Sequence, residues 1–296
     1  MNSRAFPSQL MLVGLILIIA LTSCSGSADS PPTGTATPVP PTRTPFPPSP
    51  TPIPTAAVVN GDLITLAAYQ EELARYQAAV NRDLTEEDRQ IVLQDMIYQT
   101  LLAQGAAAEG FQISEEELDQ RLSTLETGSL SLQDWLADNG YTEESFRANL
   151  KRSLEAAWMR DQILAEVPTK AEQIRAQQIL FYERNLAESV DDTLRSGANF
   201  DQLAAQYDPQ TRGDLGWFPR GYLTLPALDE ILFALEGGDI TEIIETEIGY
   251  HIIKVIEKDP DRTLDPAVRL VLQEQALQDW LDRRWKLSTI QITLPQ

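Results

Sequence analysis

Cysteine and histidine are almost absent from this chain. It has one of each, Cys24 and His251. A single cysteine excludes an intramolecular disulfide, and one cysteine with one histidine cannot supply the ligands of a Cys/His zinc site. No EF-hand-like spacing of carboxylates is present either. The sequence therefore predicts no Cys/His metal centre, and no motif supports a site made of carboxylates alone.

Basic residues are also scarce. The 296 residues include 23 Lys and Arg against 44 Asp and Glu, which gives a net charge of −21. Nucleic-acid binding needs clustered Lys and Arg, so nucleic acid is excluded as a partner. The acidity itself favours solubility. With 43% hydrophobic residues, the chain is long enough to bury one or two cores.

The N-terminus has an apolar run that is too short to span a bilayer. This run, "LMLVGLILIIAL", covers residues 10–21, whereas a transmembrane helix needs about 20 apolar residues. Its length fits the apolar region of a secretory signal. The following "LTSC" resembles a bacterial lipobox, which predicts a signal peptide at 1–23 and acylation of Cys24. The alternative is an ordinary signal peptide that happens to contain a cysteine.

Proline and threonine dominate the next segment. Residues 31–55 contain eleven prolines and seven threonines and show no core-forming pattern. Such a sequence favours extended polyproline II at about 3.1 Å per residue, a reach of roughly 80 Å. We expect residues 24–56 to be a spacer behind a membrane anchor. A glycosylated stalk or a ligand for proline-binding modules are the alternatives.

Helical periodicity characterises residues 57–167. "VVNGDLI" (58–64) is a hairpin signal because Asn-Gly lies between apolar residues. Thr65, Thr85 and Thr142 are predicted to cap helices, and apolar residues recur at helical spacing after each. Residues 262–296 predict a further helix, followed by a strand-like "TIQITL". We hypothesise that this last segment pairs with "VVNGDLI", so that both ends of the chain join one helical domain.

The pattern changes between residues 174 and 258. "IRAQQIL" alternates like a strand, helical segments follow, and "ITEIIET" and "GYHIIKVIE" again predict strands. Between the helical segments lies "RGDLGWFPRG" (212–221), whose three glycines predict a bent loop. The order β-α-α-loop-α-β-β predicts a compact α+β domain inserted into the helical one.

Two sets of motifs carry a family resemblance. "QIRAQQIL", "GDLGWFPRG" and "LFALEGGDITEIIETEIGYHIIKV" resemble the parvulin-type (PpiC) peptidyl-prolyl isomerases over 174–258. "VVNGDLIT", "DMIYQTLLAQGAAAEGFQISEEELD" and "GYTEESFRANLKRSL" resemble the chaperone domain of SurA- and PrsA-like exported foldases. The resemblance implies a four-stranded parvulin-like sheet with surrounding helices, activity on X-Pro bonds of unfolded exported polypeptides, and no cofactor.

The resemblance also implies a set of catalytic positions. Asp214 in "GDLG" takes the polar catalytic position, and His251 in "GYHII" matches the second family histidine. The first family histidine is replaced by Gln178, which can donate and accept hydrogen bonds but cannot titrate. That replacement, with a shortened loop before "GDLG", implies weak activity. The non-catalytic alternatives are a turn role for Asp214 and a structural role for His251.

A proline-ring cup is implied by the same comparison. Phe233 matches its aromatic wall, for which ordinary helix-face burial is the alternative, and either Leu223 or Leu225 stands where the family often has Met. Trp217 and Phe218 are expected to anchor the glycine loop in the core.

Two other functions compete with the isomerase. One is a holdase that cradles unfolded chains while its parvulin domain has lost turnover, which the glutamine at 178 favours. The other is a hydrolase built around His251, but no G-x-S-x-G motif is present. The tripeptide "RGD" (212–214) as an adhesion signal is weaker still, since the parvulin motif already accounts for its glycine and aspartate.

Overall fold

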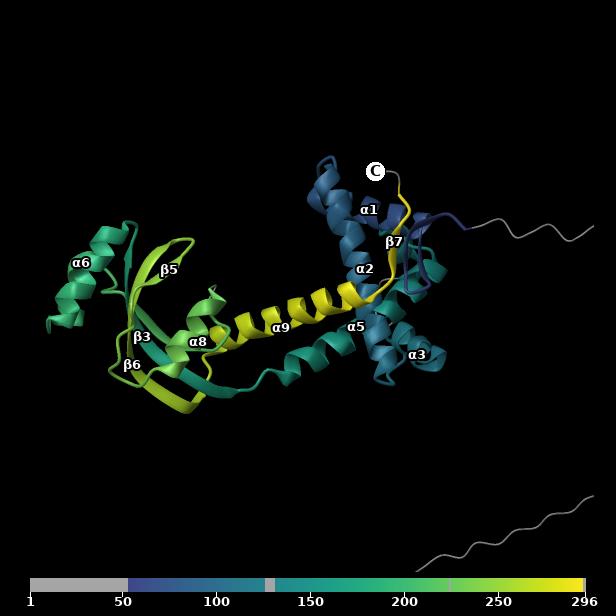
Figure 1. Cartoon of the computed structure of the whole chain (residues 1–296). Helices are drawn as coiled ribbons and strands as arrows, with labels where there is room; N and C mark the ends of the chain where they lie inside the picture. The colour runs from purple at the N-terminus through teal and green to yellow at the C-terminus, as the bar shows by residue number, and fades with distance from the viewer. Residues whose placement is uncertain (1–52, 126–130, 224, 295–296) are drawn as a thin grey trace, which may run out of the picture. The chain divides into compact units, whose positions relative to one another are not determined.

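A computed structural model describes residues 53–125, 131–223 and 225–294 of the chain. The proposed signal peptide, Cys24 and all but the last residues of the Pro/Thr-rich segment lie outside the described residues. Within the described residues the elements form a helical part and an α/β part (Figure 1).

A small sheet joins the two ends of the described chain. It contains β1 (Thr55–Val59), β2 (Asp62–Thr65) and β7 (Ile290–Ile292), in the order β2-β1-β7. Asn60 and Gly61 turn the β1–β2 hairpin with φ values of 52° and 99°, as the Asn-Gly signal predicts. The antiparallel pairing of β7 with β1 confirms the hypothesis for the last strand.

Helices make up the rest of this part. They are α1 (Leu66–Val80), α2 (Glu86–Ala108), α3 (Glu115–Leu125), α4 (Leu132–Asp138), α5 (Glu143–Glu166) and α9 (Pro266–Leu287). The side chains of Thr65, Thr85 and Thr142 each accept a hydrogen bond from the backbone three residues on, which confirms the three predicted caps. Since those bonds are local, the sequence alone specifies where these helices begin.

The long helices α2, α5 and α9 pack against each other. Leu102, Met159 and Leu281 are buried in one cluster at this junction. Gly105 lets Trp280 approach α2, because a Cβ at that position would lie 2.8 Å from the indole ring. The C-terminal helix is therefore part of the helical core.

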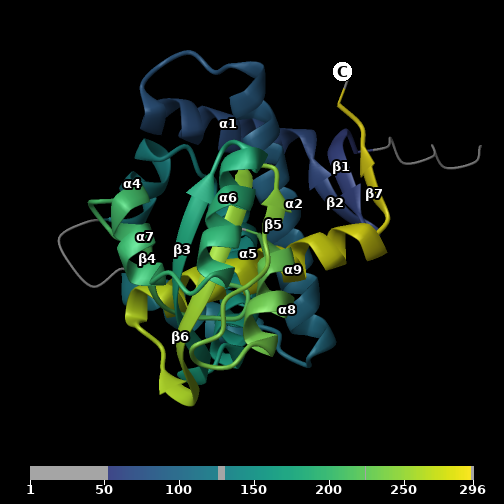
Figure 2. The ribbon, with the colours of Figure 1, turned by 60° about the vertical axis from the view of Figure 1, so that its left-hand side comes forward.

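The α/β part is a four-stranded antiparallel sheet with helices on both faces. Its elements are β3 (Lys170–Phe181), α6 (Arg184–Arg195), α7 (Phe200–Tyr207), β4 (Asp214–Pro219), α8 (Pro226–Ala234), β5 (Ile244–Thr246) and β6 (Gly249–Thr263). The strand order is β4-β3-β6-β5. Figures 1 and 2 show the two long strands β3 and β6 side by side at its centre. The α+β class is therefore confirmed.

The glycine-rich segment departs from its predicted loop. Residues 214–219 form the edge strand β4, which pairs with β3. The pairing contains a register shift, since Ala176 pairs with Gly216 and the next residue, Gln177, pairs with Asp214. This shift lets the pairing tolerate glycines. Such a bulge accommodates the positive φ of 67° at Gly216. Phe218 is fully buried, as expected, whereas Trp217 is only half-buried and packs beneath the guanidinium of Arg262.

The last two strands also differ in length from the prediction. β5 includes only the end of "ITEIIET", with Ile240 making an isolated bridge to Lys254. β6 extends beyond "GYHIIKVIE" to Thr263, because β3 is long enough to pair with it over that whole length.

Candidate isomerase site

Strand alternation places Gln178 and His251 on the face of the sheet that α8 covers. On β3 and β6, Ala176 and Ile253 pack in the cluster around α8, whereas Ile179 and Ile252 pack in the cluster under α6 and α7. Successive side chains of a strand point to opposite faces. Gln178 and His251 therefore share a face and stand diagonally across the β3–β6 pair, with His251 opposite Leu180.

His251 is held at both ring nitrogens. Nδ1 lies 3.3 Å from Oε1 of Gln178, and Nε2 lies 2.8 Å from the hydroxyl oxygen of Thr246. The histidine is 2% exposed, and burial lowers its pKa below the ordinary value because the charged form loses its hydration. The lowered pKa favours the neutral imidazole, and in that form a ring whose Nδ1–H donates to Oε1 of Gln178 has Nε2 as the acceptor for the Thr246 hydroxyl.

Thr246 is a member of this cluster that the sequence did not reveal. Its hydroxyl oxygen also lies 3.2 Å from the carbonyl oxygen of Gly249, which competes with Nε2 for the single hydroxyl proton, and it accepts from the amide of Ile248. These contacts form where β5 turns back into β6. The only available signal was the turn-like "TEIGYH", in which a threonine precedes the histidine by five residues.

Asp214 lies at the start of β4 and is held separately. Its carboxylate accepts a hydrogen bond from the amide of Gly216 at 3.0 Å and forms an ion pair with Arg175 at 3.3 Å. These contacts, with the amide of Gly216 the larger cause, lower the pKa of Asp214. Among the described residues, its side chain has no hydrogen bond to Gln178 or His251. Its side chain is 45% exposed, so it presents a stable negative charge to solvent.

A hollow of about 280 Å³ lies between β3, β4 and α7. Gln178 and Asp214 both line it, together with Tyr207. The structure thus brings these two predicted residues to one cavity. His251 does not line this cavity. It contacts Gln178, which does.

The implied proline cup is closed in this structure. Phe233 is 2% exposed and lies edge-on to Phe218, with ring centroids 6.3 Å apart. The guanidinium of Arg220 covers its ring at 4.3 Å. Leu223 and Leu225 are both half-buried against the same cluster. The three apolar residues are therefore brought together, with Arg220 as a cover that the sequence did not predict.

Comparison with known families identifies the class. Residues 10–160 match the SurA-like N-terminal domain, and residues 163–257 match the PPIC-type PPIASE domain. The first match alone covers just over half of the chain. The chain belongs to the SurA-like family and carries a parvulin-type isomerase domain.

Its relatives include foldases. The chain is 26% identical to "Foldase protein PrsA 3" of Bacillus anthracis, over 71% of this chain and 77% of that protein. It is 27% identical to "Foldase protein PrsA" of Caldanaerobacter subterraneus, over 67% and 72%. Among solved structures, the peptidylprolyl isomerase PrsA of Bacillus anthracis gives a TM-score of 0.42 at 23% identity, covering 66% of this chain and 95% of that chain.

The described residues contain neither a cluster of metal ligands nor a membrane-spanning helix. No group of three or more His, Cys, Asp or Glu within residues 53–294, apart from the undescribed positions, could hold a metal ion. In the same part of the chain, no helix is long and apolar enough to cross a membrane.

Proposed function

We propose that this protein is an exported foldase that catalyses cis-trans isomerisation of X-Pro bonds in unfolded polypeptides. The observation that carries the proposal is the pairing of a buried, neutral His251 with Gln178 and Thr246 beside a cavity that Asp214 lines. The parvulin-type domain match and the PrsA foldase relatives support it.

The chemistry needs no nucleophile. Rotation about an X-Pro bond loses amide resonance, and the barrier of about 18–20 kcal/mol makes the unaided reaction take tens to hundreds of seconds. A rate gain of ~10⁴ requires a barrier only about 5.5 kcal/mol lower. Binding that is tighter in the twisted state can supply it.

Each polar residue has a role in that twist. The planar amide carries partial negative charge on its carbonyl oxygen, so a nearby Asp214 carboxylate disfavours the planar state more than the twisted one. His251, held between Gln178 and Thr246, positions the Gln178 amide toward the substrate. Gln178 makes one hydrogen bond to His251, whereas two histidines would form a network that can titrate. We therefore expect slow turnover.

The proline ring would bind against Phe233. The ring of Phe233 is covered by Arg220, which also forms an ion pair with Glu172 at 3.4 Å. Arg220 is half-exposed, so its side chain can swing outward and admit a prolyl ring between Phe233 and the leucines at 223 and 225.

Refolding of a client limited by proline isomerisation tests this function. Asp214→Ala and Thr246→Val should each slow catalysis at least fivefold relative to the wild type. Asp201→Ala is the matched control, since Asp201 is an exposed aspartate of the same domain that pairs with Lys254. If wild-type protein does not accelerate refolding above the uncatalysed rate, the isomerase proposal is wrong.

A holdase without turnover is the second candidate. The observations that favour it are the glutamine at 178 and the closed cover over Phe233. In the same assay, suppressed client aggregation with no acceleration of refolding by any variant would support it over the isomerase.

We also propose that the chain is tethered outside the cytoplasm through an acylated Cys24, by way of a 24–56 spacer. The tether would carry a helical chaperone domain (57–167, completed by 262–296) and the isomerase domain (174–258). The lipobox-like "LTSC" supports the anchor. Cys24→Ala should move the expressed protein from the membrane fraction to the soluble fraction, and unchanged membrane association would contradict the lipid anchor.

A further inference from the structure

Two asparagines of the chain, Asn60 and Asn139, are followed by glycine. An Asn-Gly peptide can lose its side-chain amide spontaneously, because glycine carries no side chain that would keep its backbone nitrogen away from the asparagine Cγ. The reaction requires the asparagine side chain and the following peptide to rotate toward each other. Whether a folded protein permits that rotation depends on the hydrogen bonds that hold the two groups, and these differ between the two sites.

Four hydrogen bonds hold Asn60 in the turn of the small sheet. Its Nδ2 donates to Oε1 of Gln104 at 2.8 Å and to the hydroxyl of Ser288 at 3.0 Å, and its Oδ1 accepts from the amide of Thr289 at 2.8 Å. Its own amide donates to the carbonyl of Thr289. Val59, which precedes it, is fully buried. Because rotation of Asn60 would break these bonds together, the fold protects this site.

Asn139 lies at the C-terminal end of α4 and is exposed. Among the described residues, its side chain makes one hydrogen bond, from Nδ2 to the carbonyl of Trp135 at 2.8 Å. Gly140 then turns the chain with a φ of 68°, and its amide donates back to α4. The helix α4 has only seven residues, of which Leu136 alone is buried. Local opening of this turn therefore costs little.

We propose that Asn139 is a site of spontaneous deamidation in the folded protein, whereas Asn60 is protected. The amide nitrogen of Gly140 attacks Cγ of Asn139, and a new C–N bond forms. The Nδ2 group leaves as ammonia, taking up the proton that the Gly140 amide gives up. Water then opens the resulting cyclic imide at either carbonyl and leaves aspartate or isoaspartate. The inference does not depend on the proposed isomerase activity.

The product carries a charge where α4 does not favour one. A carboxylate at position 139 follows Asp138 at the C-terminal end of the helix, and the helix dipole disfavours negative charge there. The carboxylate also has no donor for the carbonyl of Trp135, which loses the bond from Asn139. Deamidation should therefore destabilise the last turn of α4.

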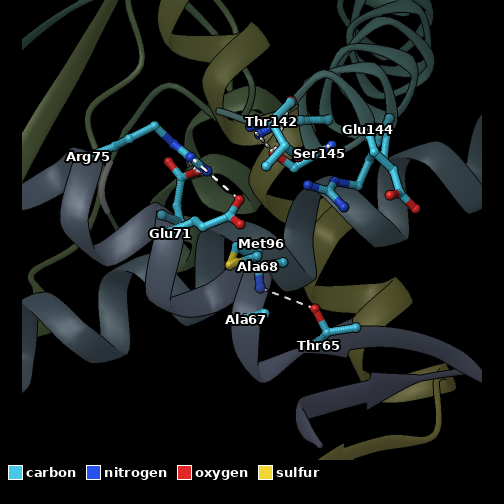
Figure 3. Close-up of a pocket in the computed structure, with 13 residues that line it drawn as sticks. Thr65, Ala67, Ala68, Glu71, Arg75, Met96, Thr142, Glu144 and Ser145 are labelled. Atoms are coloured by element: carbon cyan, nitrogen blue, oxygen red, sulfur yellow. Dashed lines mark hydrogen bonds and ion pairs between the residues drawn. The ribbon is translucent and has the colours of Figure 1, made fainter. Parts of the chain in front are cut away.

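The aromatic residues beside this turn connect it to α1. Trp135 stacks on Tyr141, with ring centroids 6.1 Å apart, and the guanidinium of Arg75 lies over the Tyr141 ring at 4.0 Å. Figure 3 shows Arg75 on α1 and Thr142 at the start of α5, which line the same hollow of about 400 Å³. Loss of the Asn139 bond to Trp135 should therefore loosen the α4–α5 turn from α1.

Peptide mapping of the full chain after incubation in mildly alkaline buffer measures both conversions at once. Each Asn-Gly falls in its own tryptic peptide, 44–75 and 122–147, and each peptide contains one asparagine. Mass spectrometry detects the exchange of ammonia for water, and chromatography separates the aspartate and isoaspartate products. We expect Asn139 to convert about tenfold faster than Asn60, because fewer hydrogen bonds must break. Equal rates, or faster conversion of Asn60, would overturn the proposal.

The same chain unfolded in urea is the reference. Both asparagines should then convert at similar rates, since each precedes glycine and neither is held. A preference for Asn139 that is as large in urea as in the folded chain would show that folding does not protect Asn60, and would also refute the proposal.

Two substitutions test the protection and the consequence separately. Ser288→Ala removes one bond from Asn60 and should speed its conversion several-fold, with Asn139 in the same sample as the unchanged control; no change at Asn60 would contradict the protection. Asn139→Asp, which introduces the product, should lower the melting temperature. Gln133→Glu is the matched control, since it adds the same charge in the first turn of α4, where the dipole favours it. Equal melting of these two variants would refute the expected loosening.

Discussion

Gly213 and Gly216 allow a controlled test of how β4 supports the site. Both have positive φ, 68° and 67°, so alanine at either position adopts a left-handed backbone that costs roughly 1–2 kcal/mol. Their surroundings differ. A Cβ at Gly216 meets nothing within 4 Å, whereas a Cβ at Gly213 would overlap the carbonyl oxygen of Gln178 and lie 3.0 Å from its carbonyl carbon.

The steric difference gives the expected magnitudes. Gly216→Ala should lose only the cost of the left-handed backbone, about 4–16 °C in melting temperature if the α/β part unfolds as one unit. Gly213→Ala must also break the 2.8 Å hydrogen bond from the amide of Gln178 to the carbonyl of Gly213, so it should lose at least twice as much. It should also reduce isomerase activity, because Gln178 holds His251.

Calorimetry of the two variants beside the wild type measures both losses, and the proline-limited refolding assay measures activity. Equal melting temperatures for the two alanine variants would refute the argument that close packing against Gln178 makes a glycine necessary at position 213.

Further predictions concern the buried histidine, a helix cap and the C-terminal strand. Because the folded-state pKa of His251 is depressed, the unfolded state binds more protons, and stability should fall as pH drops below about 6.5. In urea unfolding, the stability of His251→Gln should fall less steeply between pH 7 and 5 than that of the wild type. An identical slope would contradict this. Asp88→Ala removes both the capping-box bond to Thr85 and the ion pair with Arg82, so its melting temperature should fall, whereas the exposed control Glu117→Ala should melt like the wild type. Deleting residues 288–296 removes β7 and its hydrogen bonds to Asn60 and Ala56, each worth about 1 kcal/mol. The melting temperature should therefore fall by several degrees. Unchanged melting would show that β7 adds nothing to the stability of the small sheet.

Local signals made much of the fold predictable. A threonine whose hydroxyl accepts from an amide three residues on specifies a helix start without any tertiary contact, as at Thr65, Thr85 and Thr142. The pairing of β7 with β1 was also predictable, because alternating apolar residues at both ends of the chain need a partner strand.

Features that depend on tertiary contacts were harder to predict. The high glycine content of 212–221 predicted a loop and not a strand, and it is a bulge in β4 itself, between Asp214 and Gly216, that makes the glycines compatible with pairing. Thr246 joins His251 only because β5 turns back on β6. Arg220 covers Phe233, and the half-buried Arg152 lines three separate hollows of the helical part. Neither position is marked by any local pattern, because both result from packing between separate elements.

Exchange of a short X-Pro peptide between its cis and trans forms is the most direct measurement of the proposed activity. NMR exchange spectroscopy with catalytic amounts of the full chain should give cis–trans cross-peaks within a mixing time of about a second, whereas the unaided peptide exchanges over tens to hundreds of seconds. The peaks should persist with Asp201→Ala and weaken strongly with Asp214→Ala. Wild-type protein that leaves the exchange rate at its unaided value would contradict the account.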